Sequence, residues 1–182
     1  VELGIGYGSK QGNTLLQDIL SLMNFSSKDE SMQLATEKGA FSAFSGSKYV
    51  TDKQFIMRFA KQGAISRESW QELNKDILKL GLRNSSTIAL PPTGNSSLLV
   101  GASNSIEPHF SLSNPFTKAP IQAAVNYIEG QAYLSEEQKV QLLNALKKGE
   151  NNILETDGGL SRLFRTATEI TAQEHLSVVI AA

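Results

Sequence analysis

The sequence predicts a helix-rich α/β fold with few strands. Apolar residues recur at helical spacing in several segments, while the run Thr87–Leu90 is short, apolar and β-branched, which suits a buried strand. Pro91 and Pro92 would end that strand, since neither can donate a ladder hydrogen bond. At 182 residues the chain is long enough for one domain with a real core, and we expect residues 1–182 to form a single unit.

The first part of the chain favours a helical hairpin. Residues 11–24 carry a broad apolar face, and Ser27 with Glu30 matches the capping-box pattern that begins a second helix. Gly39 is then the expected residue just past the helix end. The apolar residues of the first helix are Leu15, Leu16, Ile19, Leu20, Leu22 and Met23.

Aromatic residues and two further helices follow. We expect Phe41, Phe44 and Tyr49 to anchor a Gly/Ser-rich connection onto the core rather than to contact a ligand. A short helix is predicted around Phe55–Ala60, and Arg83-Asn84 is expected to anchor the chain before the strand. Another helix should run from a Ser66 cap to Gly81, with these residues facing inward: Trp70, Leu73, Ile77 and Leu80.

The turn after Pro92 is the candidate binding site. A strand, a small-residue turn and a helix opening at Leu98–Val100 would together leave helix N–H groups free to bind an anion. It is not a nucleotide P-loop, because no Gly-Lys-Ser/Thr follows. The alternative is a plain turn with Ser96 as an N-cap. The candidate phosphate-binding residues are Thr93, Gly94, Asn95, Ser96 and Ser97.

Other polar residues give weaker signals. Glu107 precedes a proline and could act as an acid or base, although tying down a turn is the favoured role. His175 lies one turn into a helix capped by Thr171 and Glu174, so a packed and hydrogen-bonded side chain is expected. With two histidines and no cysteine, neither His109 nor His175 supports a metal site.

The remaining residues predict helices and turns. Within Asn114–Gly149 we expect one helix with an apolar stripe and a second helix capped by Ser135–Gln138. Thr156–Gly159 should form a turn, and a final apolar helix should run from Thr171 to Ala182. The stripe of the first helix is Ile121, Ala124, Val125 and Ile128, and the buried face of the second is Val140, Leu142, Leu143 and Leu146.

Composition excludes several classes of protein. A formal net charge of -1 argues against a general binder of nucleic acid or anionic membrane. No apolar run approaches the length of a membrane span and no leader is recognisable, so a cytoplasmic protein is expected. The sequence has no cysteine, so this chain offers no disulfide, thiolate metal ligand or cysteine nucleophile.

Three blocks in order and spacing resemble the substrate-phosphate segment of the ribonucleotide reductase large (catalytic) subunit: Gly81–Ser85 (GLRNS), Ala89–Ser97 (ALPPTGNSS) and Ser105–Pro108 (SIEP). A second match, Leu163–Leu176, looks like the family's Phe-x-Thr-Ala-x-Glu/Asp-Ile-x-x-x-x-His segment, best known from adenosylcobalamin-dependent members. A weaker match runs from Glu2–Ile5 through the first helices to Phe41.

This resemblance implies the second half of the family's catalytic α/β barrel, with few strands. Its role would be to hold the phosphates of a ribonucleoside diphosphate or triphosphate through Thr93–Ser97, while Asn95 departs from the threonine of many relatives. The cysteines that carry the family's radical reduction are absent, so no catalytic residue is expected and the chain alone should be inactive.

The expected partners are the ribonucleotide and the remainder of the subunit, with a possible homodimer covering open edges. Adenosylcobalamin is the implied cofactor, and this fragment alone should bind none. Two alternatives stay open: a non-catalytic helical scaffold module without a nucleotide site, and an independent phosphosugar enzyme using Glu107 or His109 as its base.

Overall fold

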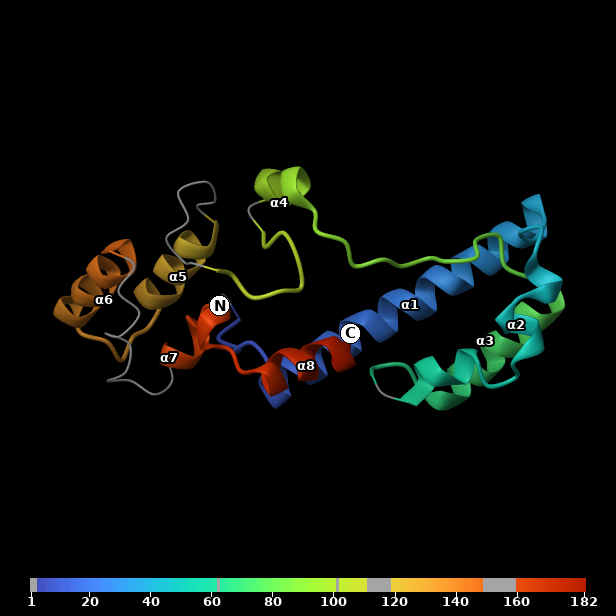
Figure 1. Cartoon of the computed structure of the whole chain (residues 1–182), viewed down its shortest axis with the longest axis horizontal. Helices are drawn as coiled ribbons and strands as arrows, with labels where there is room; N and C mark the ends of the chain where they lie inside the picture. Colours follow the sequence, from blue (N-terminus) through green and yellow to red (C-terminus); the bar gives the residue numbers. More distant parts are fainter. Residues whose placement is uncertain (1–2, 62, 101, 111–118, 149–159) are drawn as a thin grey trace. The chain divides into compact units, whose positions relative to one another are not determined.

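The computed structural model describes residues 3–61, 63–100, 102–110, 119–148 and 160–182, and within them every regular element is a helix (Figure 1). The chain contacts divide into two compact units, one from residues 14–89 with 181–182 and one from residues 1–13 with 90–180. The elements are α1 (Lys10–Lys38), η1 (Phe44–Gly46), α2 (Lys48–Thr51), η2 (Ile56–Lys61), α3 (Arg67–Leu80), α4 (Gly94–Val100), α5 (Ala119–Glu129), α6 (Glu136–Lys148), α7 (Leu160–Leu163), η4 (Ala167–Glu169) and α8 (Ala172–Ala181).

The predicted helical hairpin is wrong, because α1 is one helix of 29 residues. Ser27 does not cap a second helix: its hydroxyl lies 3.1 Å from the Asn24 carbonyl oxygen, a bond available to a serine inside a helix. No glycine or proline interrupts the chain there, so nothing stops the helix before Lys38. Gly39 ends it as predicted, with φ of 79° and its N–H donating to the Ala35 carbonyl at 2.9 Å.

The core of the unit formed by residues 14–89 is aromatic. Trp70 and Ile77 of α3 are fully buried, and Ser66 caps this helix by accepting from the Ser69 N–H at 3.1 Å, as predicted. Leu80 is 40% exposed, so its predicted burial is wrong; it stands in the last turn, beyond the inward-facing stripe. The partly buried aromatic residues packed on this core are Phe25, Phe41, Phe44, Phe55 and Phe59, which confirms the anchoring prediction for Phe41 and Phe44.

Hydrogen bonds to α1 and to Gly39 fix residues 83–84, which precede the candidate turn. Arg83 donates its N–H to the Ser31 carbonyl at 2.9 Å and its guanidinium to the Lys38 and Gly39 carbonyls at 3.3 Å. The Asn84 N–H donates to the Ser31 hydroxyl at 2.9 Å. Arg83 and Asn84 are therefore structural anchors, as expected.

Thr87–Leu90 does not form the predicted strand. A strand is defined by ladder hydrogen bonds to a neighbour, and the described residues contain no second strand to supply them. The Thr87 hydroxyl instead lies 3.0 Å from the Ser27 hydroxyl. This part of the α/β prediction is wrong for the chain as the structure describes it, which is helical.

In the other unit, α5 and α6 pack through a small apolar core. Ser135 and Gln138 form the predicted capping box, with the Ser135 N–H donating to Gln138 Oε1 at 2.9 Å. Val140 is 55% exposed, contrary to its predicted burial, because it lies on the outer side of α6. The buried residues of this core are Ala124, Ile128, Leu142, Leu146 and Phe164.

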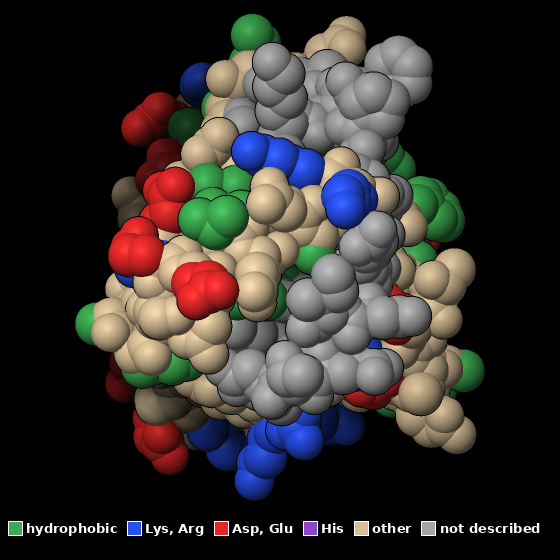
Figure 2. Space-filling model, turned by 90° about the vertical axis from the view of Figure 1, so that its left-hand side faces the viewer, with side chains coloured by type: hydrophobic (Ala, Val, Ile, Leu, Met, Phe, Trp, Pro, Cys, Tyr) green, Lys and Arg blue, Asp and Glu red, His purple; other side chains and the backbone are tan. Residues whose placement is uncertain are grey.

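One face of the molecule carries mixed charge. In Figure 2 most acidic side chains on this face lie at the left, basic side chains lie at the upper centre and along the bottom, and hydrophobic side chains form small separate areas. None of the described helices is both long enough and apolar enough to span a bilayer. The predicted turn Thr156–Gly159 lies outside the described residues.

Candidate functional site

The candidate turn begins at Thr93, which two contacts hold in place. Its N–H donates to the Asn104 carbonyl at 2.7 Å, and its own carbonyl accepts from the Ser97 N–H at 2.8 Å. The first contact joins the start of α4 to the segment that follows the helix, and the second closes the first helical turn. Thr93 is therefore the residue that fixes where α4 begins.

Three amide groups of the turn remain available. Gly94, Asn95 and Ser96 are the first three residues of α4, and helix geometry gives their N–H groups no partner inside the helix. All three residues are exposed, and no acceptor among the described residues bonds to these N–H groups. These donors are thus open to an anion from outside.

Ser97 has a different environment. It is 4% exposed, its hydroxyl donates to the Gly94 carbonyl at 2.8 Å, and its N–H is used within the helix. Of the five predicted residues, Ser97 and Thr93 therefore shape the turn through internal bonds. Asn104, which sequence reasoning did not select, is the third residue of this framework.

Gly94 has no conformational reason to be glycine. Its φ is not positive, and a Cβ built on it would meet no atom within 4 Å in the described structure. A side chain at this position would therefore extend into open space among the described residues.

Glu107 and His109, which follow the turn in the sequence, have mainly structural contacts. The Ser105 hydroxyl accepts from the Glu107 N–H at 3.1 Å, so this turn is tied by a serine rather than by the Glu107 carboxylate. The His109 carbonyl accepts from the Ala167 N–H at 2.8 Å. Burial lowers the pKa of His109, which favours the neutral imidazole.

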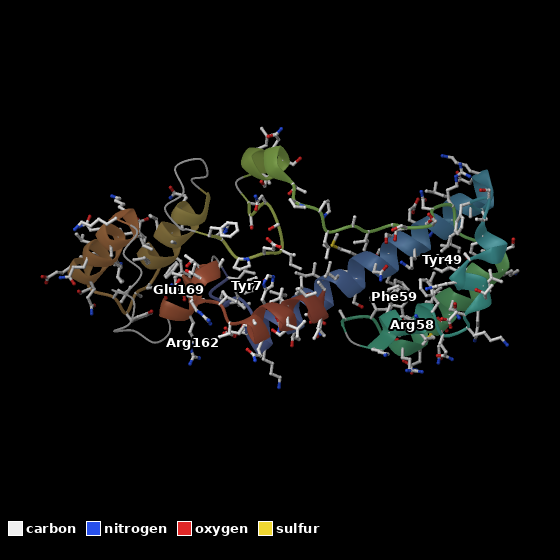
Figure 3. All side chains as sticks on the ribbon, in the orientation of Figure 1. Tyr7, Tyr49, Arg58, Phe59, Arg162 and Glu169 are labelled. Atoms are coloured by element: carbon white, nitrogen blue, oxygen red, sulfur yellow. The ribbon has the colours of Figure 1, made fainter. Side chains whose placement is uncertain are left out.

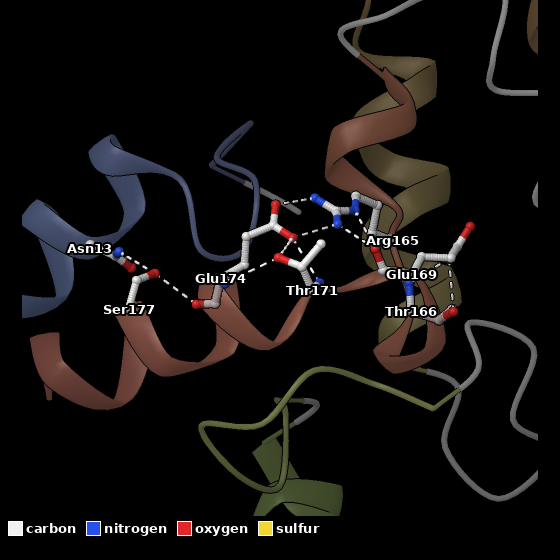
Figure 4. Close-up of polar contacts among 7 residues, drawn as sticks. All are labelled: Asn13, Arg165, Thr166, Glu169, Thr171, Glu174 and Ser177. Carbon is white, nitrogen blue, oxygen red and sulfur yellow. Dashed lines mark hydrogen bonds and ion pairs between the residues drawn. The ribbon is translucent and has the colours of Figure 1, made fainter.

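The second motif, Leu163–Leu176, is held together by Glu174 (Figure 4). Its carboxylate accepts from the Thr171 N–H at 2.8 Å and hydroxyl at 2.7 Å, and the Glu174 N–H returns a bond to that hydroxyl at 3.2 Å. This confirms the predicted cap of α8. Arg165 adds a two-pronged ion pair, with Nη1 at 2.5 Å from Oε1 and Nη2 at 2.7 Å from Oε2.

These bonds control the charge of Glu174. The hydrogen bonds from Arg165 and then from Thr171 lower the pKa of its carboxyl to about 2, so it is ionised at neutral pH. Sequence reasoning missed the Arg165 partner, since opposite charges nine positions apart carry no local pattern. It also missed a second capping interaction, in which the Glu169 carboxylate accepts from the Thr166 N–H at 2.7 Å. The Thr-x-x-Glu spacing of these residues could have predicted it.

The N-terminal motif packs onto this second motif, with Tyr7 in the position labelled in Figure 3. The Tyr7 and His175 rings meet edge to face with centroids 6.3 Å apart, which confirms that His175 is packed. Gly8 has φ of 70°, and a Cβ there would come within 2.9 Å of Glu174 Cβ. The structure thus brings together two sequence blocks from opposite ends of the chain.

The described residues contain no group of three or more His, Cys, Asp or Glu side chains placed to hold a metal ion. The candidate site consists of hydroxyl, amide and backbone donors. Such donors suit an anionic oxygen ligand.

Comparison with known proteins shows the family. A family described as "Ribonucleotide reductase, barrel domain" matches residues 1–182. The relatives include the ribonucleoside-diphosphate reductase large chain of Encephalitozoon cuniculi, 29% identical over 92% of this chain and 21% of that protein. They also include large chain 2 of Saccharomyces cerevisiae, 35% identical over 58% of this chain and 12% of that protein.

The subunit alpha of Chlamydia pneumoniae is 26% identical over 93% of this chain and 18% of that protein. The chain thus spans about a fifth or less of the length of these relatives. Their names describe diphosphate reductases and give no support to the adenosylcobalamin expectation. Because the family match covers residues 1–182, the chain belongs to the ribonucleotide reductase family, as part of its barrel domain.

Proposed function

We propose that this chain is part of the catalytic barrel of a ribonucleoside-diphosphate reductase and that its turn at Thr93–Ser97 holds the substrate phosphates. The observation that carries the proposal is that Gly94, Asn95 and Ser96 are exposed residues at the start of α4 whose N–H groups bond to no acceptor among the described residues. N–H groups in the first turn of a helix can bind phosphate oxygens without a lysine.

The framework of the turn supports this role. The bonds from Thr93 to Asn104 and from Ser97 to Thr93 fix the backbone before any ligand arrives, so less conformational entropy is lost on binding. The Ser96 hydroxyl and the Asn95 amide can add side-chain donors. At Gly94 the close approach of a phosphate accounts for a glycine that the backbone conformation does not require.

The names of the relatives favour a diphosphate over a triphosphate substrate. The sequence contains no cysteine, so in this proposal the thiols for ribose reduction come from the remainder of the subunit, and this chain orients the ribose through its phosphates. The single barrel domain, the cytoplasmic location and the pairing of two copies stay predictions.

The test uses two measurements. In the complete subunit, Gly94→Val places a branched side chain over the three amides and should raise the KM for a ribonucleoside diphosphate about tenfold or more, since each bond to a charged group contributes about 1.5–3 kcal/mol. Val100→Ala on the same helix is the control and should leave KM unchanged.

In the 182-residue chain, added pyrophosphate should shift the NMR amide signals of Gly94, Asn95 and Ser96. The Gly39 amide, which already donates to Ala35, should not move. An unchanged KM in Gly94→Val together with unmoved amide signals would refute the phosphate role and favour the scaffold alternative.

A further inference from the structure

A buried lysine lies outside the candidate site, in the unit formed by residues 14–89. Lys28 of α1 is only 4% exposed, which is rare for an ammonium group. Its Nζ donates to Asn24 Oδ1 one turn earlier and lies 4.8 Å from the centre of the Phe59 ring. Phe59 belongs to η2, where Figure 3 labels it beside Arg58.

No carboxylate balances this charge. Among the described residues, no Asp or Glu oxygen forms an ion pair with Lys28 Nζ. Near η2, Asp52 pairs with Arg58 at 2.5 Å, and on α1 itself Asp29 accepts from Gln33 at 3.0 Å. Of the other charged groups in this unit, Asp18 of α1 is partly buried ten positions before Lys28, and these are exposed to water: Glu30, Glu37, Lys38, Lys48, Lys53, Lys61, Arg67, Glu68, Glu72, Lys75, Asp76, Lys79 and Arg83.

Among the described residues, the contacts of the Lys28 ammonium are therefore one neutral acceptor, Asn24, and one ring face, Phe59. An ammonium has three donors, and a single amide oxygen and a ring face replace little of its hydration. Burial accordingly lowers the pKa of Lys28 to about 8 from its usual 10.5. The neutral amine fits this site better than the cation.

We propose that Lys28 is a proton-sensitive switch in the stability of the unit formed by residues 14–89: loss of its proton removes an uncompensated buried charge and stabilises the unit, and gain of the proton destabilises it. The proposal is independent of the phosphate site. Since the folded state binds the proton more weakly than the unfolded state, stability is expected to rise between about pH 8 and about pH 10.5 and to be flat below pH 8 with respect to this group.

The chain contains its own reporter for the test. Trp70 is the only tryptophan, and its ring lies 5.9 Å from the Phe59 ring and 5.2 Å from the Phe25 ring. Urea unfolding of the 182-residue chain, followed by Trp70 fluorescence, therefore measures the unit that contains Lys28. Tyr49, whose pKa is raised by burial, has the opposite effect above about pH 10, so the series should stop near pH 9.5.

The folding equilibrium constant of the wild type should rise by up to about tenfold per pH unit above pH 8. Lys28→Met should be more stable than wild type at pH 7, and its folding equilibrium constant should not rise above pH 8. Lys28→Arg stays charged, so its folding equilibrium constant should not rise either, and it should be less stable than wild type. Lys38→Met, an exposed lysine of the same helix, should behave as wild type.

A direct titration provides the second readout. The ¹³Cε signal of Lys28 should titrate near pH 8, below the ordinary lysine pKa of 10.5. A Lys28 titration at that ordinary value, or equal pH responses in wild type and Lys28→Met, would overturn the proposal.

Discussion

At the scale of single residues, Glu174 shows what sequence reasoning can and cannot find. Its bonds to Thr171 follow from a local Thr-x-x-Glu pattern and were predicted. Its ion pair with Arg165 depends on the path of the chain through η4, which no local pattern encodes. The low pKa of Glu174 comes first from the partner that the sequence did not reveal.

The Glu174 contacts predict acid sensitivity. Because its folded-state pKa of about 2 lies below the unfolded value of about 4.3, its contribution to stability is present above pH 4.3 and is lost as the pH falls toward 2. The free energy of unfolding of the 182-residue chain should therefore fall less steeply between pH 5 and pH 2.5 in Glu174→Gln than in wild type. Glu136→Gln, which alters an exposed pair with Lys139, is the control and should follow wild type.

Gly63 gives a second prediction at this scale. Its φ is 108°, and a Cβ there would lie 2.3 Å from Ser21 Cβ, so both the backbone and the packing oppose a side chain. Gly63→Ala should lower the free energy of unfolding by about 2–5 kcal/mol, combining backbone strain and overpacking.

Two glycine variants separate these causes in the same urea-unfolding measurement. Gly39→Ala meets no neighbour but has φ of 79°, so it should cost only about 1–2 kcal/mol. Gly46→Ala has neither problem and should change stability by less than about 0.5 kcal/mol. Equal losses in Gly63→Ala and Gly39→Ala would show that the Ser21 contact does not matter.

At the scale of elements, periodicity predicted α3, α5 and α6 because each buries one stripe and begins at or near a recognisable signal. Ser66 and Ser135 are such signals, and both cap as expected. The prediction failed at Ser27, since Ser-x-x-Glu within a run of good helix formers is also compatible with an uninterrupted helix. The packing around Ser27 decides between a helix start and an uninterrupted helix, and a local sequence pattern does not contain that information.

The continuity of α1 can be tested at Ser26, which is exposed. In a hairpin this position would lie before the second helix and would accept proline. In one continuous helix, Ser26→Pro removes a hydrogen bond and should cost about 3 kcal/mol or more, measured by urea unfolding. Ser26→Ala should stay within about 0.5 kcal/mol of wild type; a proline variant as stable as the alanine variant would contradict a single helix.

At the scale of the whole molecule, the sequence motifs predicted the family correctly, and they predicted a strand that the described residues of this chain do not form. Family membership rests on residues spread over the full length, and the match to the barrel domain confirms it. Thr87–Leu90 has the composition of a strand, but strand pairing is a property of neighbours, and none is described in this chain. Composition alone therefore could not determine the state of this segment.

Hydrogen exchange should reveal this dependence. In the 182-residue chain the amides of Thr87–Leu90 should exchange rapidly, because no ladder bond to a described residue protects them. In the complete subunit we expect neighbouring strands to slow their exchange at least about tenfold. The Gly81 amide, which donates to Ile77 at 2.8 Å, serves as the internal reference. Equally fast exchange in both proteins would argue against a barrel strand at this position.

The contact of Gly8 with Glu174 has a consequence for biosynthesis. Residues 14–89 are continuous in sequence and can assemble almost all of their unit soon after they leave the ribosome, because a compact unit can fold during synthesis. The other unit needs residues 1–13 together with residues up to 180. Residues 1–13 must therefore wait until residues near 180 have been synthesised, so a chaperone that shields nascent chains should protect this glycine-rich segment while the residues between are made.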